Sequence, residues 1–421
     1  MKKLLIFALV LATPMFYSCN SDSDSSDDDI EYFDETDGIY LSDFSSTSVP
    51  SYDEWVISDE EADTEDFEGL YEALAAITTS GREISLSFPN LTSFPDYAIF
   101  GQDEVATYSE IVYETDDDGD EIEVESGIMT AANVLVSISA DVATSIGDYA
   151  FAFCNYVTEL NFPEVTRVGD KAFQYCSSLT SISQKEFPNV IWVGDAAFSL
   201  CLSLTSVELP TITWVNKKSF ALCKSLTSFE AQMVTNIGEW AFSGCTSLPS
   251  VYFPLVEEIE YAGFYYCTAL SEVYLPEVTN VGAWAFSYNT AFESFELPKA
   301  TNLGTQAFYS CAFESVSFPA VTRVNDGVFY SCTNLADAYL PEVTVIGEDA
   351  FRNCSALSDL SIATNSGVTL ELIDANAFFD TDTTSIDLAV GTSNAQYING
   401  NYLTVGSFSE QFQSVVAMTA L

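Results

Sequence analysis

The sequence predicts a solenoid of parallel β-strands and short helical turns, with about eleven coils of roughly 22 residues. Two observations carry this prediction. Phenylalanine recurs at a nearly constant spacing, and in nine of the units a cysteine follows it by three residues. The recurring residues are Phe151, Phe173, Phe198, Phe220, Phe242, Phe264, Phe286, Phe308, Phe329, Phe351 and Phe378. A fixed period of this length is typical of folds in which each repeat stacks on its neighbours.

The repeat at residues 204–220 shows how one coil is expected to form. Leu204, Val207 and Leu209 fit a strand whose alternate residues are buried, and a proline ends that strand. A second short inward segment follows, and a polar turn then leads into a helical turn at Phe220. No coil can bury its apolar side alone, so we expect stacking at about 4.8 Å per strand step to cover it.

The chain begins with features of an exported protein. Residues 1–18 resemble a signal peptide, because two lysines precede an apolar run too short to span a membrane. Ser18-Cys19 resembles a bacterial lipoprotein processing site, which makes Cys19 the expected lipid attachment site. An ordinary signal peptide followed by a free cysteine is the alternative. Residues 19–65 are expected to be an acidic linker, in which 20–29 resembles the export signal of surface lipoproteins in Bacteroidota-type bacteria.

Residues 66–133 are expected to cap the N-terminal end with a short helix, a degenerate repeat and a hairpin insertion. Apolar residues from Phe67 to Ile77 recur at helical spacing. Residues 111–124 alternate around an acidic, glycine-containing turn, which predicts a hairpin. The same turn has some acidic residues of a calcium loop, so calcium binding stays open, although no paired helices flank it.

The array is expected to run over residues 134–379, with a C-terminal cap at 380–421 that pairs strands around Asn399-Gly400. Its consensus is L-x-x-[VI]-x-[LF]-P-x-[VI]-T-x-[VI]-G-x-x-A-F-x-x-C-x-x-L, which resembles the BspA-like leucine-rich repeat. The resemblance implies a leucine-rich-repeat solenoid on a bacterial surface protein, and some members of that family are adhesins for host matrix or other bacteria. Departures such as Asn216 and Asn325 in place of glycine leave the fold prediction unchanged.

The row of cysteines is not expected to hold a metal. One whole coil separates successive cysteines, whereas zinc sites use short spacings and often histidine, which this chain lacks. An odd set of nine cannot pair fully, so we expect buried free thiols and no metal or cofactor. Without histidine, Ser-His and Cys-His nucleophiles are excluded, and no carboxylate pair suggests glycoside hydrolysis. The sequence therefore predicts a protein that is not an enzyme.

The formal net charge is −51. Such a chain repels phosphate backbones, so we expect no nucleic-acid partner. It also repels anionic lipid surfaces, which leaves the lipid anchor as its expected attachment to a membrane. Much of this charge serves solubility in the simplest interpretation.

Two sets of outward residues are candidates for binding. Outward strand positions align into rows when coils stack in register, and these rows mix carboxylates with tyrosine, a composition suited to protein or glycan contacts. A solvated strand face is the simpler interpretation, because tyrosine favours strands. The candidates on this face are Glu208, Glu230, Tyr252, Glu272, Tyr274, Glu296 and Tyr339. Trp192 and Trp214, one coil apart, suit a sugar face or a partner's apolar group, or pack under the nearby insertion.

The expected function is that of an outer-membrane, lipid-anchored binding protein, exposed at the cell surface and acting in protein–protein interaction or adhesion. Capture of glycans for a nutrient-uptake system is one alternative, and a structural surface component without a specific ligand is another. The sequence leaves open the ligand, the host or bacterial origin of the partner, the oligomeric state and the outward row that is used.

Overall fold

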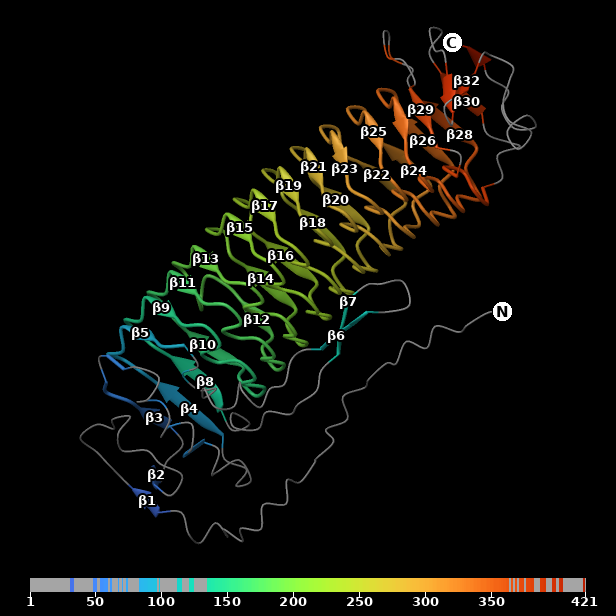
Figure 1. Ribbon diagram of the computed structural model, residues 1–421. Helices are drawn as coiled ribbons and strands as arrows, with labels where there is room; N and C mark the ends of the chain where they lie inside the picture. Colours follow the sequence, from blue (N-terminus) through green and yellow to red (C-terminus); the bar gives the residue numbers. More distant parts are fainter. Residues whose placement is uncertain are drawn as a thin grey trace, which may run out of the picture.

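The chain folds as the predicted solenoid (Figure 1). The computed structural model describes residues 135–362 without a break, much of 54–62 and 83–98, and scattered positions within 67–74 and 365–381. For the short strands within 31–50, 112–124 and 387–420 it describes the backbone alone. The segment 1–30, with the signal peptide and Cys19, lies outside the described residues.

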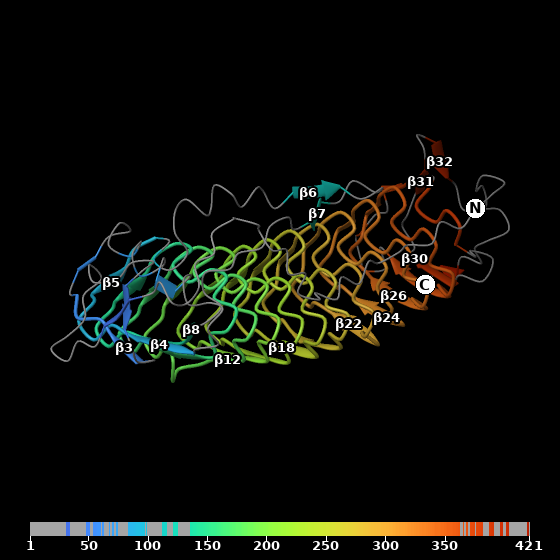
Figure 2. The same ribbon diagram turned by 90° about the horizontal axis from the view of Figure 1, so that it is seen from below.

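The longer strands of successive coils lie parallel along the solenoid (Figures 1 and 2). The apolar residue at the middle of each strand points inward, as in β14, where Val207 is buried between exposed or half-exposed neighbours. The strands are β4 (Ile84–Ser87), β8 (Leu135–Ser139), β10 (Glu159–Asn161), β12 (Ser181–Ile182), β14 (Ser206–Glu208), β16 (Ser228–Glu230), β18 (Ser250–Tyr252), β20 (Glu272–Tyr274), β22 (Ser294–Glu296), β24 (Ser315–Ser317), β26 (Asp337–Leu340) and β28 (Asp359–Ile362). Their hydrogen bonds divide these strands among four sheets, in the orders β10-β8-β4, β12-β14-β16, β18-β20 and β22-β24-β26-β28.

A second ladder contains the two-residue strand that follows the proline or its equivalent in each coil. Each of these strands places one residue outward and one inward. They are β5 (Ser93–Phe94), β9 (Ser145–Ile146), β11 (Arg167–Val168), β13 (Trp192–Val193), β15 (Trp214–Val215), β17 (Asn236–Ile237), β19 (Glu258–Ile259), β21 (Asn280–Val281), β23 (Asn302–Leu303), β25 (Arg323–Val324), β27 (Val345–Ile346) and β29 (Leu372–Ile373).

The register of the ladders follows the sequence period. Glu208 pairs with Glu230 between β14 and β16, and Tyr252 pairs with Tyr274 between β18 and β20. The degenerate first repeat also takes its place, because β4 pairs with β8 and β5 with β9. Equivalent residues of successive coils therefore stand side by side, as their phase in the sequence predicts.

The third side of each coil consists of consecutive turns rather than the short helical turn that we expected. Around Phe220, alternate N–H groups donate to the next coil, as Phe220 does to Ala241 O at 3.0 Å. The intervening N–H groups close turns within the coil, as Cys223 does to Phe220 O at 3.3 Å. Lys218 and Leu222 have φ of 54° and 59°, the left-handed region that a helix does not use. A three-residue spacing fits both turns and helix, which explains the difference.

The recurring phenylalanines form one continuous stack inside the solenoid. Successive ring centroids from Phe151 to Phe378 lie 5.1–6.0 Å apart, with nearly parallel planes. Such pairs each contribute about 0.5–1.5 kcal/mol beyond their buried area. The stack therefore runs through the core from Phe151 to Phe378 and links each repeat to the next.

The cysteines form a second buried column, and all nine described cysteines are free thiols, as predicted. From Cys176 onward, each Sγ lies within 3.0–3.3 Å of a phenylalanine carbonyl oxygen in the preceding coil and can donate to it. Asn289 takes the same place, and its Nδ2 donates to Phe264 O at 3.0 Å. The residue at this position is therefore a hydrogen-bond donor as well as a small core residue.

The coils approach so closely before each turn that a side chain has little room. A Cβ on Gly304 would lie 2.3 Å from Ala283 N of the preceding coil. Gly304 N donates to Val281 O at 2.7 Å. At the equivalent point of another coil, the side-chain amide of Asn325 donates to Leu303 O at 2.6 Å. Asparagine thus reaches this carbonyl with its side-chain amide, whereas Glu260, at the equivalent point of a third coil, keeps the backbone bond to Ile237 O at 2.8 Å.

The first strands extend the array further than its expected start. β3 (Glu54–Val56), within the expected acidic linker 19–65, pairs in parallel with β4, and its Trp55 is fully buried. β1 (Glu31–Phe33) and β2 (Ser48–Pro50) pair with each other. The Trp55 indole explains why this part of the acidic stretch joins the fold, because burying a large apolar side chain is favourable.

The predicted hairpin is confirmed as β6 (Val112–Thr115) and β7 (Glu121–Val124), which pair antiparallel. The acidic turn between them, where calcium binding was left open, lies outside the described residues. At the other end, β30 (Asp387–Val390) pairs with β28 and with β33 (Thr419–Ala420). β31 (Gln396–Ile398) and β32 (Asn401–Leu403) pair antiparallel on either side of Asn399-Gly400.

Candidate functional site

The outward residues of the longer strands form the first candidate site, which we name the strand face. All seven residues proposed for it from the sequence are exposed: Glu208, Glu230, Tyr252, Glu272, Tyr274, Glu296 and Tyr339. Outward positions from β14 to β28 carry carboxylates, tyrosines and serines, and within this described range they include no lysine or arginine. The strand face is therefore both acidic and aromatic.

Tyr252 and Tyr274 form the aromatic centre of the strand face. Their ring centroids lie 4.7 Å apart with an interplanar angle of 6°, and about half of each side chain is exposed. The parallel register places them directly opposite each other, so the strand spacing itself sets the stacking distance. The pair presents one flat, preformed apolar surface with two hydroxyl groups at its edge.

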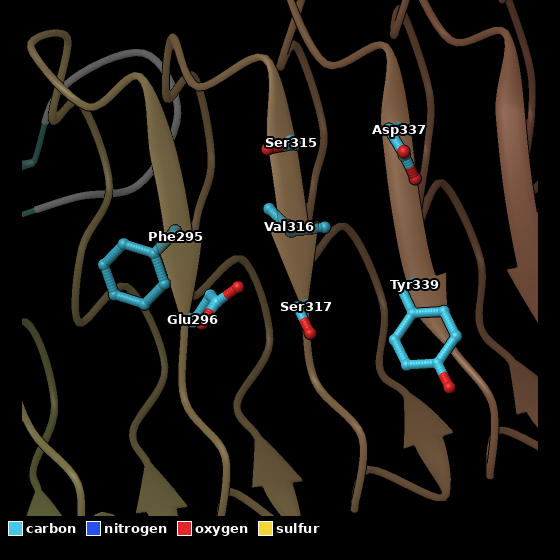
Figure 3. A pocket seen from close by; sticks show the side chains of 7 residues that line it. All are labelled: Phe295, Glu296, Ser315, Val316, Ser317, Asp337 and Tyr339. Carbon is cyan, nitrogen blue, oxygen red and sulfur yellow. The ribbon is translucent and has the colours of Figure 1, made fainter.

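A shallow hollow of about 180 Å³ lies on the same face, over β22, β24 and β26 (Figure 3). It forms because Ser315 and Ser317 are small, whereas Glu296 and Tyr339 project on either side of Ser317. Asp337 lines it as well, and burial, followed by the nearby Asp359, raises the pKa of Asp337. The hollow can receive one side chain of a partner between a carboxylate and an aromatic ring.

Trp192 and Trp214 lie on neighbouring strands, β13 and β15, of the second ladder. Both rings are partly exposed, by 39% and 45%. The guanidinium of Arg167 lies over the Trp192 ring, 5.5 Å from its centroid. Among the described residues, the ring contacts do not include one between the two tryptophans.

A further aromatic surface, which the sequence reasoning missed, lies on the turn side of the central coils. We name it the aromatic belt, and its members are Trp240, Tyr265, Trp284, Tyr288, Tyr309 and Tyr330. Their centroids lie 5.1–6.2 Å apart from coil to coil, and all six residues are half-buried. The available signal was the recurrence of aromatic residues within two positions of the repeating phenylalanine.

The described residues offer little basis for catalysis. Burial raises the pKa of the Cys223 and Cys332 thiols to about 12, so these side chains are not nucleophiles at neutral pH. The part of the chain that the structure describes contains no cluster of three or more His, Cys, Asp or Glu residues arranged to hold a metal ion. No helix within that part has the length and apolar character needed to cross a bilayer.

Comparisons with known proteins agree with this architecture. The family profile described as "BspA type Leucine rich repeat region (6 copies)" matches residues 144–271, 214–336, 257–385 and 322–411. A leucine-rich repeat protein from Bacteroides ovatus ATCC 8483 has a solved structure with 22% identity and a TM-score of 0.50, over 75% of each chain. This likeness shows the fold alone.

Two other solved structures are similar at lower scores. A leucine rich cell surface protein from Faecalibacterium prausnitzii A2-165 has 17% identity and a TM-score of 0.40, over 87% of this chain and 86% of that one. The pneumococcal vaccine antigen PcpA has 16% identity and a TM-score of 0.41, over 76% of this chain and 89% of that one. No curated protein matches the chain.

Proposed function

Because the chain belongs to the family of BspA-type leucine-rich-repeat proteins, we propose that it binds a protein partner through the strand face. It does so as a lipid-anchored protein exposed at the bacterial surface, in adhesion to host matrix or to another bacterium. The observation that carries the proposal is the stacked, exposed pair of Tyr252 and Tyr274 within a face of carboxylates.

The rigidity of the strand face favours binding. The two strands beneath the tyrosine pair, β18 and β20, are joined by ladder hydrogen bonds, so little conformational freedom is lost when a partner docks. Tyrosine is enriched at the energetic centres of protein interfaces because it buries a large area and offers one hydroxyl. The surrounding carboxylates, including Glu230 and Glu272, favour a partner surface that carries lysine or arginine.

The test is a truncation of the strand face. The full chain with Glu208, Glu230, Tyr252, Glu272 and Tyr274 replaced by alanine is expected to lose binding to extracellular matrix and to host cells. A control variant, Tyr156→Ala with Glu164→Ala, removes exposed residues of the same two types outside this face and should bind normally. Unchanged binding by the strand-face variant removes this face from the proposal.

Glycan capture through Trp192 and Trp214 is a second candidate function, favoured by the exposure of both rings. A glycan array that compares the unaltered chain with Trp192→Ala and Trp214→Ala tests it. Loss of a specific glycan signal in either variant supports capture at that ring. If neither proteins nor glycans bind the unaltered chain, a structural surface component is the remaining function.

The proposed anchor depends on Cys19. With Cys19→Ala, the acyl chains have no attachment point, and the protein is expected to leave the membrane fraction and appear in soluble form. Membrane fractionation followed by immunoblotting measures this change, and Cys223→Ala serves as the matched control because its thiol is buried in the core. Continued membrane association of Cys19→Ala contradicts lipid anchoring at this residue.

A further inference from the structure

We propose, on the basis of the function proposed above, that the hollow over β22, β24 and β26 binds one arginine side chain of the partner protein. Its volume of about 180 Å³ suits a single side chain rather than a segment of backbone. The tyrosine pair on β18 and β20 and this hollow would then contact the same partner at two places on the strand face.

The shape of the hollow comes from one small residue between two large ones. Ser317 stands in register between Glu296 on β22 and Tyr339 on β26 (Figure 3). Neighbouring strands lie about 4.8 Å apart, so the backbones that carry Glu296 and Tyr339 are roughly 10 Å apart. In other coils the equivalent position carries a large side chain, such as Tyr252 or Tyr274. A slot therefore opens here between a carboxylate and an aromatic ring.

The polar groups around the slot are unpaired within the chain. In the part of the chain that the structure describes, no ion pair or hydrogen bond engages the carboxylates of Glu296 and Asp337 or the hydroxyl of Tyr339. Asp337 stands opposite Asp359 in register, and burial, followed by this second carboxylate, raises the pKa of Asp337. The slot thus concentrates negative charge that no neighbouring cation offsets.

The cations of the same coils lie elsewhere. Lys299 pairs with Glu277, and Arg352 Nη1 pairs with Asp349 Oδ2 at 3.2 Å. Arg323 is an outward residue of the second ladder. The described residues also form no group of three His, Cys, Asp or Glu that could hold a metal ion. The complementary charge therefore has to come from another molecule, as an organic cation.

The arrangement of groups favours arginine over lysine. A guanidinium is planar, stacks on aromatic rings and presents five N–H donors in a fixed fork, whereas an ammonium is a compact point charge. Tyr339 supplies the ring, and a cation over such a face is attracted to it. Glu296 and Asp337 supply charged acceptors from two strands, and Ser315 and Ser317 add hydroxyl acceptors between them.

The experiment titrates the full chain with Nα-acetyl-arginine methylamide and follows binding by saturation-transfer NMR. The citrulline analogue has nearly the same shape without the charge, and the lysine analogue has the charge without the planar group. The arginine probe is expected to bind at least tenfold more tightly than the citrulline probe, and more tightly than the lysine probe. Equal binding of either analogue overturns the proposal.

A variant that fills the slot separates local binding from general attraction to an acidic chain. Ser317→Tyr leaves the net charge unchanged and is expected to weaken binding of the arginine probe at least tenfold. It should fold normally, because tyrosine already occupies the equivalent position at Tyr252, Tyr274 and Tyr339. Normal binding of the probe by Ser317→Tyr overturns the proposal, since the attraction would then be diffuse.

A second variant keeps the test decisive if Ser317→Tyr does not fold. Glu296→Gln with Asp337→Asn removes the charged acceptors without changing their shape, and it should weaken the arginine probe at least tenfold. Glu164→Gln with Glu257→Gln removes two exposed carboxylates outside the strand face and should bind the probe normally. Equal losses in these two double variants overturn the proposal.

The matrix and host-cell assay distinguishes this site from the function on which it rests. Ser317→Tyr is expected to bind matrix or host cells at least tenfold more weakly than the unaltered chain. If it binds them normally while the strand-face variant does not, the arginine site is overturned and the proposed function stands. If the slot binds the arginine probe in a chain that binds neither matrix nor host cells, the proposed function is overturned and the arginine site stands.

Discussion

The residue three positions after each repeating phenylalanine has two roles, and the second requires a hydrogen-bond donor. It fills the core, and it donates to the phenylalanine carbonyl of the preceding coil. Asn289 preserves the donor, but its Oδ1 is buried without a hydrogen-bond partner. A buried polar atom left unsatisfied costs about 1–3 kcal/mol.

Asn289→Cys is therefore expected to stabilise the protein by about 1–2 kcal/mol, because it removes the unsatisfied oxygen and keeps a donor. Chemical denaturation monitored by circular dichroism measures the change. Asn289→Ala is the matched control, since it removes the oxygen together with the donor and leaves a small cavity. A cysteine variant that is less stable than the unaltered chain contradicts this account of the column.

At the scale of one coil, the close approach before each turn limits which residues are accepted. Gly304→Ala is expected to destabilise the protein by about 1–3 kcal/mol, because its Cβ meets the backbone of the preceding coil. Gly304→Asn places a Cβ at the same point but adds an amide that can donate to Val281 O, as Asn325 donates to Leu303 O, so it should cost less than alanine. Thermal denaturation of both variants measures the difference, and equal losses would show that the amide donor is unimportant.

The turn segment is also where the sequence was hardest to interpret at this scale. The spacing of Phe220, Cys223 and Leu226 fits a helical turn, yet alternate N–H groups there bond to the next coil. Nothing in one repeat by itself shows this, because the acceptors belong to another repeat. The positive φ of ordinary residues such as Lys218 and Leu222 is likewise maintained by stacking rather than by local preference.

At the scale of the whole molecule, the buried thiols make stability depend on pH in the alkaline range. Burial raises their pKa above the ordinary value of 9.0, to about 12 for Cys223 and Cys332. Because the folded pKa lies above the unfolded one, this contribution to stability is fully present below about pH 9 and is lost as the pH rises toward 12. The unfolded chain releases thiol protons first, so alkaline pH favours unfolding.

The Tm is therefore expected to fall steadily above about pH 9. Circular dichroism measures unfolding, and iodoacetamide labelling followed by mass spectrometry measures exposure of the thiols. Labelling should begin only where the fold is lost, since all nine described thiols are buried. Labelling of any of these nine thiols in the folded chain at pH 8 would contradict the burial of the column.

Some features of the candidate sites could be predicted from the sequence, and others could not. The strand face could be predicted because register follows directly from the repeat, so Glu208 had to stand beside Glu230 and Tyr252 beside Tyr274. The hollow over β24 could not, because it depends on how far Glu296 and Tyr339 project beside two small serines. The aromatic belt also went unrecognised, because Trp240 and Tyr265 lie in different repeats and at different phases.

The sequence by itself determined the solenoid, its register and the inward columns of phenylalanine and cysteine, because a period of 22 residues leaves one way to bury every apolar side. The tertiary structure alone decided that the third side is made of turns, that the cysteines donate to carbonyls, and which aromatic rings meet on the surface. Those features depend on contacts between neighbouring coils, and such contacts are set by stacking distance and backbone conformation rather than by the order of residues within one repeat.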